Sequence, residues 1–370
     1  MIIAVNTRLK KDEQPEGYEN FMFEMLSRLV KKFPQHQYLY IFDSPYDVTL
    51  SFAENVIPII AGPKTGSILR LQYWFNYKIP AVLRKYKADV FVSMEDICSL
   101  RTKIPQCLLI TDLCFLQSPQ LLKNSQAGFY KNFMPFFLAK ATSIATVSEF
   151  SKQVIADHYK INDVDVIKPG IDDIFNPLDW EEKEIIKEKY TDGKAYFLFS
   201  GNINQCSNII NLLKAFSLFK KRQKSNMLLL IASNADEVFK KELKTYAFRT
   251  EVKLIENLSK EELAKLTAAA YVLVYPVLHN DIAMAPLQAM QCGVPVICSN
   301  TGALRSICGD AALYANPGDF KDIAENMMLV FKDEDKAKTL VLAGKMQLHQ
   351  YNWDKTADLL MQSILKAVNN

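Results

Sequence analysis

Long apolar runs, paired cysteines and a leader-like N-terminus are all missing from this sequence of 370 residues. No segment holds the roughly 18 consecutive apolar residues that a transmembrane helix needs, so no membrane span is predicted. The first apolar stretch, MIIAVNT, is followed at once by charged residues and is too short for a signal peptide. The seven cysteines lie singly without a CxxC pair, which argues against a disulfide framework and a zinc site. These absences predict a cytoplasmic protein with no metal centre.

Two further absences concern charged residues. No glutamate occurs between Leu263 and Asp322, and neither lysine nor arginine occurs between Lys194 and Lys214. The net charge of +3 is too small to indicate nucleic-acid binding, which usually needs a strongly basic surface. The small excess of base lies before Gly170, with 20 Lys and Arg against 16 Asp and Glu. This asymmetry hints at contact with a membrane surface, and at nothing more specific.

Short apolar runs alternate with helical stretches along the whole chain. In the first half the strand-like runs are MIIAVNT, YLYIFDS, VIPIIAG, DVFVSM, QCLLITDL and SIATVS. In the second half they are AYFLFSG, MLLLIAS, EVKLIEN, YVLVYP, VPVICS and AALYAN. Apolar strands separated by helices predict parallel sheets that are covered on both faces. A chain of this length is expected to form two such α/β domains, doubly wound and facing each other across a cleft.

The domain boundary is predicted at the charged segment that follows DVDVIKPG. Residues 1–170 form the first domain, 171–194 a linker, 195–350 the second domain, and 351–370 a C-terminal helix that returns to the first domain. Ligands of doubly wound sheets bind at the carboxyl ends of the strands. The loops after Asp112, Gly201 and Tyr275 are therefore the first places to look for a site.

Several blocks of sequence, spread along the whole chain, carry a resemblance to a known family. They include MIIAVNTRL, ITDLCFLQSP, IATVSEFSKQVI, VIKPGID, YFLFSGNINQCSNIINLLKAF, APLQAMQCGVPVICSN and YNWDKTADLL. Together they resemble the GT-B fold glycosyltransferases of family four (group 1 type), which are retaining and use nucleotide sugars. The resemblance runs from end to end and implies an acceptor-side first domain and a nucleotide-sugar-side second domain. It also implies that Gly17, Gly201 and Asn202 lie in ligand-binding loops.

The charged positions of that family are replaced in this chain. The Arg and Lys that stabilise the departing diphosphate align with Cys206 and Ser207. Two glutamates with seven residues between them, which hold the sugar and the ribose, align with Asn280 and Gln288. These amides still accept hydrogen bonds but carry no charge. Asp281 is the only acid in that loop, one residue out of register.

The acid–base position is altered as well. The family's histidine–aspartate pair aligns with Thr111-Asp112, so Asp112 remains to manage a proton while the histidine is lost. His279 is the one histidine expected near the cleft. Arg305 stands where the family's second signature has no base, and its charge would compensate in part. The catalytic candidates are therefore Asp112, Thr111 and Asn280, and the other substituted positions are candidates for nucleotide-sugar binding.

Two hypotheses remain open from the sequence. The chain transfers a hexose from a nucleoside-diphosphate sugar to a surface-glycan or lipid-linked acceptor, at full or attenuated rate, without a further cofactor. Alternatively it is an inactive relative that binds a glycan or a partner glycosyltransferase. The segment LRLQYWFNYKIPAVLRKYK also has two interpretations, an interfacial helix at the inner face of the membrane or a core-packed helix with a solvated basic face.

Overall fold

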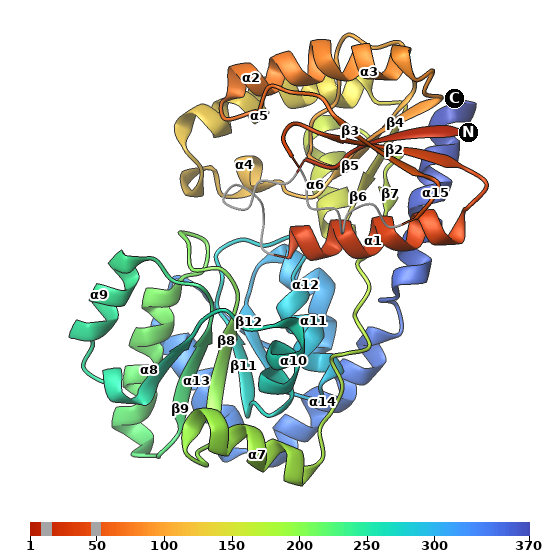
Figure 1. The fold of residues 1–370 in the computed structure, drawn as a ribbon. Helices are drawn as coiled ribbons and strands as arrows, with labels where there is room; N and C mark the ends of the chain where they lie inside the picture. The colour runs from red at the N-terminus through yellow and green to blue at the C-terminus, as the bar shows by residue number, and fades with distance from the viewer. Residues whose placement is uncertain (9–16, 46–52) are drawn as a thin grey trace. The chain divides into compact units, whose positions relative to one another are not determined.

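The computed structural model describes residues 1–8, 17–45 and 53–370, which form two compact units (Figure 1). The first unit contains Met1–Gly170 together with Asn352–Asn370, and the second contains Ile171–Tyr351. Each unit is built on its own sheet and has its own hydrophobic core. The chain therefore leaves the first unit once and re-enters it for its last helix.

The described part of the first unit contains a parallel sheet in the order β3-β2-β1-β4-β5-β6-β7. Its strands are β1 (Ile2–Asn6), β2 (Gln37–Phe42), β3 (Val56–Ile60), β4 (Val90–Ser93), β5 (Gln106–Ile110), β6 (Ser143–Thr146) and β7 (Asp165–Val166). Its helices are α1 (Tyr18–Lys32), α2 (Ile68–Tyr73), the π-helix η2 (Trp74–Lys78), α3 (Ile79–Lys85), α4 (Cys114–Gln117), the 3-10 helix η3 (Pro119–Leu121), α5 (Asn124–Lys140), α6 (Glu149–Tyr159) and α15 (Trp353–Asn369). The strand order turns back between β1 and β4, so the two halves of the sheet are wound in opposite directions from that point.

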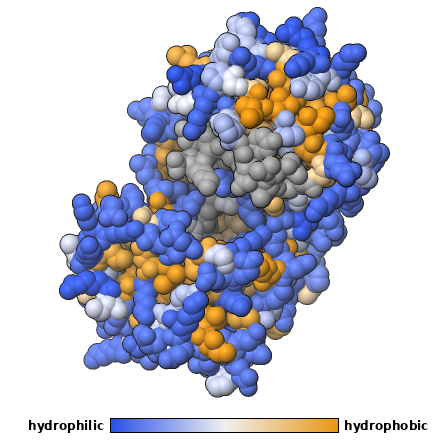
Figure 2. All heavy atoms as spheres, in the orientation of Figure 1, coloured by the Kyte–Doolittle hydropathy of each residue, from blue (hydrophilic) through white to orange (hydrophobic). Residues whose placement is uncertain are grey.

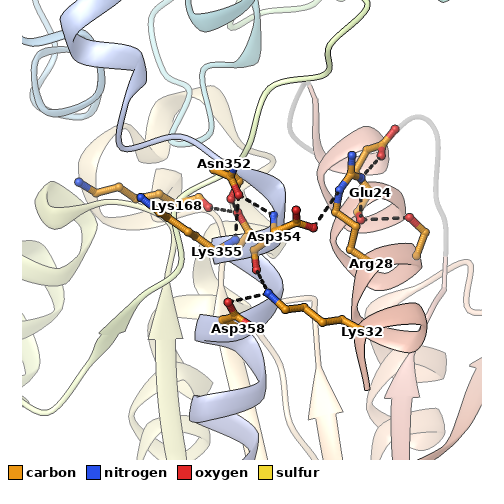
Figure 3. Close-up of polar contacts among 10 residues, drawn as sticks. Glu24, Arg28, Lys32, Lys168, Asn352, Asp354, Lys355 and Asp358 are labelled. Atoms are coloured by element: carbon orange, nitrogen blue, oxygen red, sulfur yellow. Dashed lines mark hydrogen bonds and ion pairs between the residues drawn. The ribbon is translucent and has the colours of Figure 1, made fainter. Parts of the chain in front are cut away.

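The C-terminal helix α15 is fastened to the first unit by packing and by polar contacts (Figure 3). Asn352 caps the helix by accepting hydrogen bonds from the amides of Asp354 and Lys355 at 2.9 and 3.1 Å. Lys32 of α1 forms an ion pair with Asp358 at 2.7 Å. At the start of the same helix Trp353 is buried directly against Gly170. Residues far apart in the sequence thus complete one core.

The second unit holds a parallel sheet in the order β10-β9-β8-β11-β12-β13. Its strands are β8 (Tyr196–Ser200), β9 (Leu228–Ala232), β10 (Val252–Ile255), β11 (Val272–Tyr275), β12 (Val296–Ser299) and β13 (Ala312–Ala315). Its helices are α7 (Trp180–Thr191), α8 (Ile209–Gln223), α9 (Glu237–Thr245), the 3-10 helix η4 (Arg249–Glu251), α10 (Lys260–Ala268), α11 (Met284–Gln291), α12 (Gly302–Cys308), the 3-10 helix η5 (Gly309–Ala311), α13 (Phe320–Lys332) and α14 (Glu334–Leu348). Here the strand order turns back between β8 and β11. The predicted fold class, two doubly wound parallel sheets, is confirmed.

Residues 171–194, which we expected to be a linker, belong to the second unit. The charge-rich stretch forms α7, which packs against α10. Asp179 and Glu182 make a reciprocal capping box that satisfies amides at the start of the helix. The acidic residues that suggested a solvated linker are therefore a helix-start signal, and Ile186 is buried on the inner side of this helix.

Candidate functional site

A cavity of about 470 Å³ opens in the first unit where the strand order turns back. Loops of a doubly wound sheet diverge at such a point and leave a crevice beyond the carboxyl ends of the strands. The polar side of the cavity is formed by residues that follow β1, β4 and β5, with two tyrosines. These residues are Arg8, Tyr18, Glu95, Asp96, Thr111, Asp112 and Tyr130.

A buried ion pair forms one part of this polar wall. The Nε and Nη2 atoms of Arg8 lie 2.8 and 2.6 Å from Oε2 of Glu95, and both side chains are 6% exposed. Nη1 of Arg8 donates to the hydroxyl of Thr65 at 2.6 Å. Burial opposes the charge on Arg8, but Glu95 outweighs it and the pKa of the guanidinium is raised. The charge of the Arg8 guanidinium is therefore directed at the carboxyl group of Glu95.

Asp96 and Asp112 form the second part of the wall. Asp96 takes a left-handed conformation with φ of 59°, which aspartate tolerates better than most residues. Its Oδ1 atom accepts hydrogen bonds from the amide of Thr111 at 2.6 Å, the hydroxyl of Thr111 at 3.3 Å and the amide of Asp112 at 3.4 Å. Burial and the neighbouring Asp112 raise the pKa of Asp96 well above its usual range. Two carboxyl groups thus share one end of the cavity.

The structure brings the predicted residues Thr111 and Asp112 to this cavity, in different roles. Thr111 is buried and orients Asp96, whereas Asp112 is half-buried and accepts a hydrogen bond from the amide of Cys114 at 2.7 Å. Gly17 precedes α1 with φ of 81°, and the next residue, Tyr18, donates its hydroxyl to the carbonyl of Met94 at 2.6 Å. Gly17 therefore serves the entry into the helix.

Sequence reasoning missed the other half of this wall, Arg8, Glu95 and Asp96. One signal for them was present: Arg8 follows the first apolar run, and Glu95-Asp96 follow the run DVFVSM. Both runs end where the sheet changes direction, so their following residues meet. These residues can be recognised as parts of one site only when the pairing of β1 with β4 is known.

In the second unit the corresponding loops follow β8 and β11, and hydrogen bonds join them to each other. The amide of Leu278 donates to the carbonyl of Cys206 at 2.8 Å. The side chain of Asn208 donates to the carbonyls of Pro276 and Pro317 at 2.8 and 2.7 Å. The predicted nucleotide-sugar loops therefore form one connected cluster.

The loop after β8 satisfies its own amides. Oδ1 of Asn204 accepts hydrogen bonds from the amides of Cys206 at 2.8 Å and Ser207 at 3.1 Å. Free backbone amides at the start of a helix can bind a phosphate. These two are already bonded. Gly201 follows the strand with φ of 151°, and Asn202 is exposed in the same loop.

A side chain of the loop after β11 likewise bonds the backbone amides of its own loop. Asn280 is 5% exposed; its Oδ1 accepts from the amides of Ile282 and Ala283, both at 2.9 Å, and its Nδ2 donates to the hydroxyl of Tyr275 at 2.8 Å. Its side chain therefore serves to hold the start of α11. Asp281 is buried, with Oδ2 at 3.7 Å from Nε2 of His279.

The remaining two candidates lie on the helices that follow. Gln288 is half-buried on α11. Arg305 is exposed on α12, where its guanidinium lies 4.3 Å from the centre of the Tyr314 ring and its Nε donates to Oδ1 of Asn300. The positive charge of Arg305 is thus placed at the loop that follows β12, at the same edge of the sheet as the loops after β8 and β11.

Comparison with known proteins points to one family. The family model described as "Glycosyl transferases group 1" matches residues 181–347, and this match supports a group 1 glycosyltransferase. Among curated relatives, the O-antigen chain mannosyltransferase B of Escherichia coli is 25% identical over 66% of this chain. The aligned region spans 65% of that relative, and 33% of the serotype-specific mannosyltransferase WbdA of the same species.

Solved structures of group 1 and related glycosyltransferases share the fold over nearly the whole chain. Sucrose-phosphate synthase of Thermosynechococcus elongatus superposes with a TM-score of 0.78 at 16% identity, covering 98% of this chain and 97% of that one. Anabaena HepE, solved with UDP-glucose, gives a TM-score of 0.76 at 13% identity, covering 99% of each chain. The fold of this chain is therefore GT-B.

Proposed function

We propose that the chain transfers a hexose from a nucleoside-diphosphate sugar to a surface-glycan acceptor, with retention of the anomeric configuration. The observation that carries the proposal is the cavity of the first unit, because it places carboxyl groups beside an apolar wall on the side that the family resemblance assigns to the acceptor. The O-antigen mannosyltransferase relatives support a glycan acceptor. Retention rests on the resemblance alone.

In this proposal the acceptor hydroxyl is oriented by the carboxyl groups of Asp96 and Asp112. A positioned carboxylate accepts the proton that the attacking hydroxyl loses, and Asp112, half-buried at the cavity wall, takes that role. Asp96 is held by three donors on one oxygen, so it fixes the geometry of the pair. These residues supply orientation and proton transfer on the acceptor side.

The loops of the second unit that would bind the donor predict slow sugar transfer. Negative charge gathers on the leaving diphosphate, and fixed positive charge usually stabilises it. The loop from 195 to 213 contains no Lys or Arg, and two of its amides are bonded to Asn204. Arg305 and the partial positive charge at the start of α8 are the remaining sources of stabilisation. We therefore propose an attenuated rate.

A transfer assay tests this function. The full chain is incubated with UDP-glucose or GDP-mannose and octyl α-mannopyranoside, and mass spectrometry measures the acceptor. We expect the gain of one hexosyl group, which Asp112→Ala abolishes and the remote control Asp157→Ala retains. Transfer that survives unchanged in Asp112→Ala would contradict the assignment of this cavity.

A second candidate function, a catalytically inactive glycan- or partner-binding protein, is favoured by one specific observation. Asn204 and Asn280, in the two donor loops, direct their side-chain oxygens to four backbone amides. Backbone amides that are bonded to a side chain of their own loop are not available to bind a phosphate. Calorimetric titration with UDP and GDP separates the candidates, because an inactive protein of this kind shows no heat at millimolar nucleotide.

We also propose that the protein works at the cytoplasmic face of a membrane. No helix among the described residues is long and apolar enough to cross a membrane. On α2 and η2, Leu69 is 78% exposed, and the exposed rings of Tyr73 and Tyr77 stack at 5.3 Å, whereas Trp74 and Phe75 are buried in the core. The segment thus has both predicted features: one face packs into the core, and the outer face carries apolar, aromatic and basic residues. Figure 2 shows hydrophobic residues among hydrophilic ones on the visible surface of the first unit.

A further inference from the structure

We propose that the cavity of the first unit binds the uncharged, hydroxyl-rich end of its acceptor and excludes a phosphorylated one. This inference rests on the proposed sugar transfer and names the chemical class of its acceptor. Surface-glycan acceptors come in both forms, as the neutral end of a growing chain and as a sugar that carries phosphate. The charges, hydrogen-bonding capacity and apolar wall of the cavity each favour the neutral form.

Charge is the first argument. Among the described residues that line the cavity the cations are Arg8 and Lys123, and the anions are Glu95, Asp96 and Asp112. Arg8 is bonded to Glu95 through two nitrogens and to Thr65 through the third. Lys123 is exposed at the start of α5. The described wall therefore offers a phosphate no buried unpaired cation, and the carboxyl group of Asp112 would oppose its charge.

Hydrogen-bonding capacity is the second argument. Carboxylate oxygens accept hydrogen bonds, and sugar hydroxyls donate them. Oδ1 of Asp96 already accepts three hydrogen bonds, whereas its Oδ2 accepts none from any residue in the described part of the chain. Asp96 lines the cavity, so this oxygen is a ready partner for a hydroxyl. Because burial and Asp112 favour its protonated form, the carboxyl group can also donate to a sugar oxygen.

Shape and polarity are the third argument. Apart from the carboxyl groups, the lining includes the apolar residues Leu69, Leu71, Phe115, Leu122 and Phe129. Sites for neutral organic ligands are mostly apolar with a few placed polar groups, and they range from about 300 to 1,000 Å³. A volume of about 470 Å³ falls within that range. A pyranose ring can turn its C–H face to the apolar wall and its hydroxyls to the carboxyl groups.

Saturation-transfer NMR without any nucleotide sugar tests the inference. The probes are the methyl α-pyranosides of mannose, glucose and galactose, each matched with the corresponding α-1-phosphate, so that members of a pair differ only at the anomeric substituent. We expect at least one methyl glycoside to bind at millimolar concentration and its phosphate to bind at least about tenfold more weakly. Equal or tighter binding of the phosphates would overturn the inference, and so would the absence of binding by all three glycosides.

Two variants localise the effect. Asp112→Asn replaces a carboxyl group of the cavity lining with an amide of the same size, which cannot become an anion. We expect it to narrow the preference for the neutral probe by at least about threefold. Asp157→Asn makes the same chemical change on the exposed helix α6 and should leave the preference unchanged. Identical behaviour of the two variants would contradict the placement of the site.

The binding experiment is independent of catalysis. If the neutral probes bind in preference to the phosphates while no sugar is transferred, the acceptor class stands and the proposed enzyme activity fails. If sugar is transferred while phosphorylated probes bind as well as neutral ones, the activity stands and the acceptor class fails. The two failures are therefore distinguishable.

Discussion

At the residue scale, the cavity of the first unit depends on where individual charges are placed. Glu95 and Asp96 are adjacent in the sequence, but their environments differ. Glu95 is bonded to Arg8, whereas Asp96 is bonded to neutral amides and a hydroxyl and lies near Asp112. Glu95 is thereby paired with a cation, whereas burial and Asp112 raise the pKa of Asp96. Neighbouring acids with different environments are a common way to build acid–base chemistry.

The raised pKa of Asp96 predicts how stability depends on pH. Above pH about 4, aspartate in the unfolded chain loses its proton while the buried Asp96 still favours the neutral form. The contribution of Asp96 to the free energy of unfolding is therefore present below that pH and is lost as pH rises. Asp96→Asn stays neutral, so from pH 4 to pH 7.5 we expect the wild-type protein to lose stability relative to the variant. Urea unfolding at the two pH values measures the difference, and parallel pH dependence would refute it.

The sequence predicted some site residues and missed others for a physical reason. Thr111 and Asp112 were found because one contiguous block carries them. Arg8 and Asp96 were missed because their neighbourhood depends on the pairing of β1 with β4, a contact across 87 residues that no local pattern encodes. Asn280 was expected to face a donor, yet its side-chain oxygen accepts from the amides of Ile282 and Ala283 just before α11, because asparagine readily bonds backbone amides two or three residues ahead.

At the scale of elements, the return of α15 to the first unit is fixed at one close approach. Gly170 is the last residue of the first unit before the chain enters the second unit. Its α-carbon lies against the backbone and indole ring of Trp353. A β-carbon at this position would overlap both. Arg28 and Lys32 of α1 then hold the exposed side of α15 through Asp354 and Asp358 (Figure 3). Elements could be predicted from the apolar runs, but this close approach could not.

Gly170→Ala therefore should destabilise the protein. The added methyl group must displace Trp353, and overpacking of this kind typically costs about 1–3 kcal/mol. Gly128→Ala is a matched control, because Gly128 lies in α5 with open space around its α-carbon. Alanine there should be neutral or stabilise by up to about 1 kcal/mol, since it favours helix. Chemical denaturation compares them, and equal stability of the two variants would contradict the packing account.

The outer face of α2 and η2 predicts binding to anionic lipid. Leu69, Tyr73 and Tyr77 are exposed beside Arg70, Lys78 and Arg101, and aromatic and basic side chains together favour the interface of an acidic bilayer. We expect sedimentation with phosphatidylglycerol vesicles that falls several-fold in the double variant Tyr73→Ser, Tyr77→Ser. The double variant Ile185→Ser, Val238→Ser changes exposed apolar residues of the second unit and is the control. An equal fall in sedimentation for the two double variants would show that lipid binding does not depend specifically on the outer face of α2 and η2.

At the scale of the whole molecule, the fold of the family is kept while its charged donor positions are replaced. Strand order, helix caps and core are those of two doubly wound sheets, and the superposition with relatives covers nearly the entire chain. Cys206, Ser207, Asn280 and Gln288 are neutral where the resembling family carries charge. Asn204 and Asn280 bond amides of the loops after β8 and β11, so these loops are held by neutral side chains.

Returning a charge to the loop after β8 should strengthen nucleotide binding. Cys206 is partly exposed, and Asn204 bonds the amides of Cys206 and Ser207, so Cys206→Arg is expected to fold. A charge-assisted hydrogen bond to the diphosphate would contribute about 1.5–3 kcal/mol, or roughly tenfold or more in affinity. Gln205→Arg, an exposed neighbour with the same added charge, is the control. Calorimetry with UDP and GDP decides; an equal gain in both variants would indicate only a general charge effect.

The most direct test of the account is a proton NMR time course of the full chain with a nucleoside-diphosphate hexose and the methyl α-pyranosides as acceptors. It follows the anomeric signals of donor and product in one tube. We predict that a new anomeric signal appears slowly with the configuration of the donor, and that it is lost in Asp112→Ala. A product of inverted configuration would contradict the retaining mechanism. An unchanged spectrum with both UDP-glucose and GDP-mannose, together with no binding of either nucleotide, would contradict sugar transfer itself.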